Sequence, residues 1–152
     1  MTKQQCIELF QALNAVGHLR GVKFSYGIAK NIFLLKTEID ALKKAIEPSS
    51  EFIAYDKLRV ELAVKYAKKE NDKPIIQNNE YIIEDRVAFD KAFENFKKEH
   101  KAVIDEREKQ INEYKEFLKE DIKLTLFRVK LADIPKDISA SELSGIISII
   151  DE

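Results

Sequence analysis

Three residues have side chains that are well suited to catalysis or ligand binding: both histidines, His18 and His100, and one of the arginines, Arg107. His18 and His100 lie far apart in the chain, and His100 and Arg107 both fall on one apolar stripe. Histidine can act as a general base or a metal ligand, and arginine can bind an anion. The end of a helix favours a structural role for His18. For His100 the stripe favours a partnered position in a helix–helix seam over a ligand or a base.

Arg107 has several interpretations. It could pair with an acid such as Glu38 or Asp56, extend outward to solvent, mark the point where the stripe crosses over, or bind an anion inside a groove. Tyrosines are amphipathic and suit interfaces. The candidate interaction residues are therefore His100, Arg107, Tyr114 and Tyr26.

No short catalytic motif is present in the sequence. It contains neither a glycine-rich GxGxxG or GxxxxGK[ST] loop nor the GxSxG and HExxH signatures. The acidic pairs at residues 105–106 and 120–121 lack the alternating oxygens and central glycine of a calcium loop. Cys6, the single cysteine, can form no intramolecular disulfide and no cysteine-based metal site, and it is expected to be buried and inert. We therefore expect a binding protein with no catalytic residue, metal or cofactor.

The charge pattern disfavours a nucleic-acid partner. The chain has 26 basic and 27 acidic residues, a net charge of -1, and interleaves both signs. Binding through counterion release needs a basic face or run. The first 20 residues, with Glu8, Asn14 and His18, do not resemble a signal peptide, and the longest apolar runs are too short to span a membrane. We expect a cytoplasmic protein without a membrane partner.

Two long amphipathic helices, residues 26–69 and 85–119, are predicted to form an antiparallel hairpin. The first has apolar residues spaced by four and three: Ile28, Ile32, Leu35, Ile39, Leu42 and Ile46. The second continues the alternation: Phe89, Phe93, Phe96, His100, Val103, Arg107, Gln110, Tyr114 and Phe117. This spacing is typical of a coiled-coil seam. Asp85 is expected to cap the second helix, and the polar residues 70–80 to form the hairpin tip.

Pro48 lies within the first of these helices. Proline removes one hydrogen bond and clashes with the preceding turn. Because the apolar phase continues across Pro48, a kinked continuous helix is the preferred interpretation. The alternative is a break, with residues 49–50 starting a new helix. A two-helix hairpin has a thin core, so a dimer or larger bundle is also expected.

Both ends of the chain are predicted to form a base for the hairpin. Thr2 with Gln5, and Ser139 with Glu142, have the spacing of capping boxes before short helices. Apolar and polar residues alternate in two further segments, which predicts strands. They are residues 22–25 and 122–127.

Those strands lie at the open end of the hairpin, so an antiparallel pair is expected there. The predicted fold is mainly α, with a coiled-coil-like hairpin and a small two-stranded antiparallel β element. A single domain is expected over residues 1–152, with residues 1–25 and 120–152 as the base and 26–119 as the hairpin.

The segment from Leu13-Asn14-Ala15 through residues 22–32 (VKFSYGIAKNI) resembles the opening of a family of small tailed-bacteriophage proteins of unknown function. The ending, residues 129–134 (VKLADI) and 138–144 (ISASELS), is similar to the closing strand and capped helix of that family, in the same order. The chain departs from the family in lacking a Leu-Pro before Val22 and in having longer arms. The resemblance implies a setting among phage structural and lysis genes, and no activity or binding residue.

Two functions follow as hypotheses. The first is a non-enzymatic phage-encoded protein that acts by protein–protein interaction in virion or tail assembly. The second is a host-directed protein that blocks or sequesters a bacterial defence factor or a signalling ligand. The expected partner is thus a phage structural protein or a host protein. The expected location is the host bacterial cytoplasm or the virion.

Overall fold

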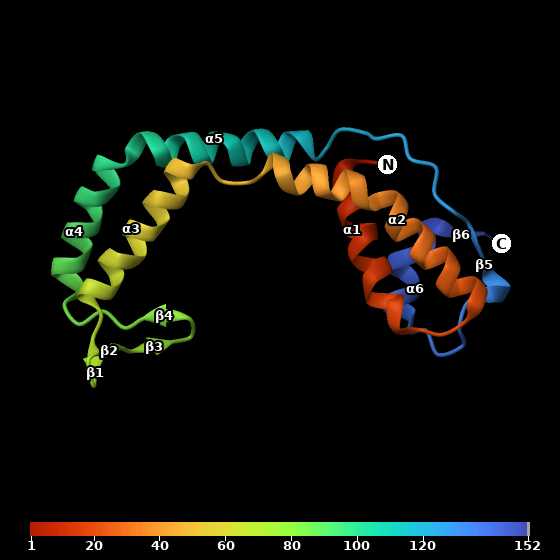
Figure 1. Ribbon diagram of the computed structural model, residues 1–152, viewed down its shortest axis with the longest axis horizontal. Coiled ribbons are helices and arrows are strands. Elements are labelled where there is room, and N and C mark those ends of the chain that lie inside the picture. The colour runs from red at the N-terminus through yellow and green to blue at the C-terminus, as the bar shows by residue number, and fades with distance from the viewer. Residues whose placement is uncertain (152) are drawn as a thin grey trace. The chain divides into compact units, whose positions relative to one another are not determined.

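The computed structural model describes residues 1–151, which are mainly helical and include three small two-stranded sheets (Figure 1). The chain divides into two compact units, Met1–Ile46 with Glu113–Glu152, and Glu47–Asn112. These boundaries differ from the expected division into a base and a hairpin. Within residues 1–151, no helix combines the length and apolar character needed to cross a membrane.

The first unit is built on α1 (Lys3–Ala15), α2 (Val22–Ala45) and α6 (Ala140–Ile146), which Figure 1 shows packed together. Short 3₁₀ helices η1 (Val16–His18), η2 (Leu131–Asp133) and η3 (Ile147–Ile149) complete it. The predicted capping boxes at both ends are confirmed. The hydroxyls of Thr2 and Ser139 accept from the backbone N–H groups of Gln5 and Glu142, whose side chains accept from the backbone N–H groups of Thr2 and Ser139. Each satisfies backbone groups that a helix start leaves unpaired.

One hydrophobic core joins these helices. Its buried members are Cys6, Leu9, Leu13, Val16, Leu19, Phe24, Ile28, Leu35, Ile39, Val129, Ile146 and Ile149. The predicted burial of Cys6 is confirmed, and burial raises the pKa of its thiol, with a smaller contribution from the charge of Glu38. A Cβ on Gly145 would lie 2.9 Å from the Cβ of Ala12, so glycine allows α6 to approach α1 this closely.

The prediction of a strand at residues 22–25 is wrong, because these residues form the first turn of α2. Gly21, with a φ of 144°, precedes the helix, and the Ser25 N–H donates to its carbonyl at 2.7 Å. In a strand, Val22 and Phe24 would share one face. Instead Val22 is 90% exposed and Phe24 is 1% exposed, as helical rotation requires.

The predicted strand at residues 122–127 is correct in its period and wrong in its pairing. Ile122, Leu124 and Leu126 are half-buried against the core, while Lys123 and Thr125 are exposed. These residues form no strand ladder. The sheet of this unit instead joins β5 (Val129–Lys130) and β6 (Ile150–Asp151), and it is parallel. The expected antiparallel pair could not form because its other strand is helical.

The second unit contains α3 (Ser50–Tyr66), α4 (Arg86–Glu99) and the first part of α5 (Lys101–Phe117). Residues 46–49 are not helical, and the Ser49 hydroxyl accepts a hydrogen bond from the Phe52 N–H. The helix therefore ends before Pro48 and a new helix starts after it, so the preferred prediction of a kinked continuous helix is wrong. The second predicted helix is interrupted at His100. The long hairpin is therefore not confirmed. Asp85 caps α4 as predicted.

The residues joining α3 and α4 form two tight antiparallel hairpins, β1 (Lys69–Glu70) with β2 (Lys73–Pro74) and β3 (Ile76–Gln77) with β4 (Glu80–Tyr81). Their turns carry four residues of positive φ: Asn71, Asp72, Asn78 and Asn79. Asparagine and aspartate tolerate this left-handed conformation, which two-residue hairpin turns require. The predicted polar tip therefore holds its own small sheets.

Candidate functional site

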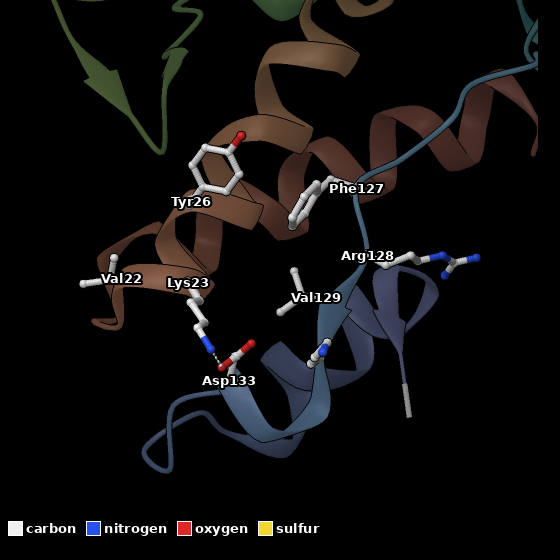
Figure 2. A pocket seen from close by; sticks show the side chains of 8 residues that line it. Val22, Lys23, Tyr26, Phe127, Arg128, Val129 and Asp133 are labelled. Atoms are coloured by element: carbon white, nitrogen blue, oxygen red, sulfur yellow. Dashed lines mark ion pairs between the residues drawn. The ribbon is translucent and has the colours of Figure 1, made fainter.

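A hollow of about 460 Å³ lies in the first unit, between the start of α2 and the segment from Phe127 to Asp133 (Figure 2). It is lined by Val22, Lys23, Tyr26, Phe127, Arg128, Val129, Lys130 and Asp133. Its volume lies in the range of sites that hold small ligands or the side chains of a bound peptide. The lining combines apolar groups with three cationic side chains, so it suits an occupant with both apolar and acidic parts.

Gly27 sets how close the two walls of the hollow lie. A Cβ built on Gly27 would lie 2.6 Å from Cγ2 of Val129 and 3.4 Å from the ring of Phe127. Two carbon atoms cannot lie 2.6 Å apart without a clash, and a close-packed interior leaves little space for Val129 to move away. Glycine at this position therefore lets Val129 of β5 and the Phe127 ring pack directly on α2.

Asn31 fixes the segment that carries Phe127. Its side chain is fully buried on α2, where Nδ2 donates to the Phe127 carbonyl at 2.9 Å. The Phe127 N–H donates to Oδ1 of the same amide at 2.7 Å. The side chain thus satisfies both backbone groups of Phe127, as a neighbouring strand would.

The role of Asn31 was not predicted, although the sequence holds a signal for it. Ile28, Asn31 and Leu35 follow each other at helical spacing, and all three are buried. A polar residue on a buried stripe needs a hydrogen-bond partner, so its position alone indicates that a backbone segment packs there. Which segment packs there follows only from the tertiary structure.

The rim of the hollow exposes apolar side chains to solvent. The rings of Tyr26 and Phe127 meet edge to face, with centroids 5.5 Å apart and planes at 84°. They remain 58% and 39% exposed, and Val22 beside them is 90% exposed. Figure 2 shows the two rings facing one another across the rim. Exposed aromatic groups of this kind are common in protein-binding surfaces.

The charges around the hollow are mainly positive. Lys23 Nζ lies 3.6 Å from the carboxylate of Asp133, and Arg128 donates to the carbonyl of Ser148 while its guanidinium points away from the centre (Figure 2). In the part of the chain that the structure describes, the ammonium of Lys130 forms no ion pair or hydrogen bond. Lys23 is paired with Asp133 and Arg128 is directed away, so within residues 1–151 Lys130 supplies the positive charge that favours an anionic group in the occupant.

Of the four predicted interaction residues, the hollow contains Tyr26 alone. Tyr114 also belongs to the first unit, is half-buried, and has its phenol pKa raised by that burial. No ring contact among residues 1–151 joins Tyr26 with Tyr114. Tyr114 does not line the hollow.

His100 and Arg107 belong to the second unit. The ring of His100 lies 4.5 Å from that of Phe96 and 5.5 Å from that of Tyr55, so His100 packs among aromatic rings of α3 and α4. Arg107 lies over the ring of Phe52 at 5.5 Å and donates to the side chain of Gln110. These contacts give His100 and Arg107 a packing role inside the unit.

The described residues, 1–151, include no cluster of three or more histidine, cysteine, aspartate or glutamate side chains that could hold a metal ion. Comparisons of the chain with models of protein families, with curated proteins and with solved structures found no match. The resemblance to the bacteriophage family therefore rests on the sequence segments that carry it, residues 13–32, 129–134 and 138–144.

Proposed function

We propose that this chain is a non-enzymatic phage-encoded protein that acts in virion or tail assembly by binding a protein partner at the hollow. One observation carries the proposal. The two segments that resemble the phage family, residues 22–32 and 129–134, supply most of the residues that line the hollow. The protein would work in the host bacterial cytoplasm or in the virion, where its phage partners are found.

The occupant of the hollow is a segment of the partner with an apolar side chain next to an acidic one. The apolar side chain would cover Val22, Tyr26 and Phe127, which are exposed in the free protein. Burial of apolar surface contributes about 25 cal/mol per Å². The acidic side chain would approach Lys130, whose ammonium has no partner within residues 1–151.

Affinity copurification from infected cells tests the proposal. The tagged protein is expected to retain a phage structural protein, and Tyr26→Ala is expected to release it. Phe33→Ala is the matched control, because Phe33 lies on the same helix, is 72% exposed and is not part of the hollow. The proposal fails if no phage structural protein is retained, or if both variants behave alike.

A second candidate function is favoured by the volume and charge of the same hollow. A hollow of about 460 Å³ rimmed by cations would also accept a small anionic signalling molecule. In that case the protein would sequester a host ligand or block a host defence factor. A rise in melting temperature with nucleotides, abolished by Lys130→Glu and unchanged by Lys57→Glu, would support this function over assembly.

A further inference from the structure

The extended segment beside the hollow leaves its backbone unpaired. In residues 1–151, the N–H and carbonyl groups of Lys123, Leu124, Thr125 and Leu126 form no hydrogen bond. The residues at either end do: the Ile122 N–H donates to the Met1 carbonyl at 2.9 Å, and Phe127 is held by Asn31. The four free residues are therefore fixed in place at both ends.

One edge of this segment already pairs with another strand-like piece of the chain. Asp121 forms an antiparallel bridge with Thr2, and the Lys3 N–H donates to the Glu120 carbonyl at 3.0 Å. Backbone polar groups of consecutive residues in an extended chain point to opposite edges. Leu124 and Leu126 thus continue the edge that Ile122 begins, beyond the point where Met1 covers it. The backbone of Phe127 points to the opposite edge, toward α2.

The side chains along the segment also have the pattern of a half-buried strand. Ile122, Leu124 and Leu126 pack on the core, and Lys123 and Thr125 face solvent. An unpaired strand edge that is held in register is a template to which another chain can add a strand. Phe127, at the end of the segment, also lines the hollow, which lies on the opposite edge, toward α2.

Charge distinguishes the possible occupants of the edge. Residues 122–130 (IKLTLFRVK) carry three cations, Lys123, Arg128 and Lys130, and no acid, within a chain of net charge -1. A second copy in antiparallel pairing would bring two sets of three cations together, and like charges on neighbouring strands are destabilising. An acidic strand from another protein has the complementary charge.

We propose that the partner binds by strand addition: an extended acidic segment forms backbone hydrogen bonds with Leu124 and Leu126 and places its acidic side chains near the cations of residues 122–130. This inference rests on the proposed function and names the binding mode and the chemistry of its partner. Backbone pairing supplies the affinity, and the three cations of residues 122–130 supply the specificity.

A peptide of alternating glutamate and valine is the probe, with a peptide of alternating lysine and valine as its control. Binding to the full chain is followed by fluorescence anisotropy at low ionic strength, and amide exchange by NMR. The acidic peptide is expected to bind and to slow exchange of the Leu124 and Leu126 amides by about tenfold or more, as amides do when they become hydrogen bonded. The basic peptide is expected to do neither.

Exposed charge reversals test the electrostatic part without disturbing the core. Lys123→Glu and Lys130→Glu together should abolish binding of the acidic peptide, while Lys57→Glu, on exposed α3 surface, should leave it unchanged. Equal binding of both peptides, or exchange at Leu124 and Leu126 that stays fast, overturns the proposal. Protection of these amides in a dimer of the protein alone also overturns it, in favour of a second copy.

The two proposals fail in different ways. If neither peptide binds but the phage partner is still retained through Tyr26, strand addition is wrong and the assembly function stands. If the acidic peptide binds and protects the two amides but no phage structural protein copurifies, the binding mode stands and the assembly function is wrong.

Discussion

The buried side chain of Asn31 holds both backbone polar groups of Phe127, with hydrogen bonds of 2.9 Å to the carbonyl and 2.7 Å from the N–H. A helix thereby takes the place of the strand that residues 122–127 were expected to pair with. The same contact positions the Phe127 ring at the rim of the hollow. This residue pair therefore supports both the fold and the proposed binding surface.

Replacing Asn31 by leucine is expected to lower the free energy of unfolding by about 1–3 kcal/mol, because it removes two hydrogen bonds and leaves the Phe127 backbone without its partner. Urea denaturation measures the change. Asn14→Ala is the matched control, since the Asn14 side chain is exposed on α1 and donates to the Phe10 carbonyl of its own helix. A surface change of that kind should alter stability by less than about 0.5 kcal/mol. Equal effects of the two variants would contradict the role of Asn31.

A methyl group on Gly27 is expected to destabilise the protein and to distort the hollow. Gly27→Ala would place its Cβ 2.6 Å from Val129 Cγ2, and overpacking of this kind costs about 1–3 kcal/mol. Gly17→Ala is the control, because a Cβ there meets nothing within 4 Å. Thermal unfolding of the two variants measures the difference. The double variant with Val129→Ala should recover part of the loss, and its failure to do so would place the strain elsewhere.

The capping box of α6 should weaken in acid. Hydrogen bonds from the side chain and backbone of Ser139 lower the pKa of the Glu142 carboxyl, with a smaller contribution from the charge of His18. A carboxyl whose pKa is lower in the folded state stabilises the fold at pH values above its ordinary pKa of 4.5. That contribution is lost as the pH falls through the pKa of the folded state. Melting temperature should therefore fall less steeply below about pH 4.5 in Glu142→Gln than in the wild type. Parallel curves would show that this carboxylate has no such role.

The thiol of Cys6 is expected to react only when the first unit opens. It is fully buried, and burial raises its pKa, so little thiolate is present at neutral pH. Reaction with an aromatic disulfide reagent should be slow in the native protein and fast in urea. Leu13→Ala, which loosens the same core, should accelerate the native reaction, whereas Phe33→Ala should not. A fast native reaction would contradict this burial.

Local sequence signals predicted the parts of the fold that depend on neighbouring residues. The caps at Thr2, Asp85 and Ser139 form as expected, because a side chain reaches a backbone group three residues away in any context. The burial of Cys6 and the two-residue period of residues 122–127 were also predicted. At Pro48, the sequence supported both a kink and a break, and the structure decided for the break.

The prediction failed where the result depended on segments distant in sequence. Four alternating residues, 22–25, fit a strand or the first turn of a helix, and the packing of Phe24 into the core decided for the helix. The hollow depends on β5 approaching α2 at Gly27, about 100 residues away in the chain. The sequence by itself determined the caps and the apolar stripes. Only the tertiary structure decided that Asn31 pairs with Phe127, because contacts of that range depend on how the whole core packs.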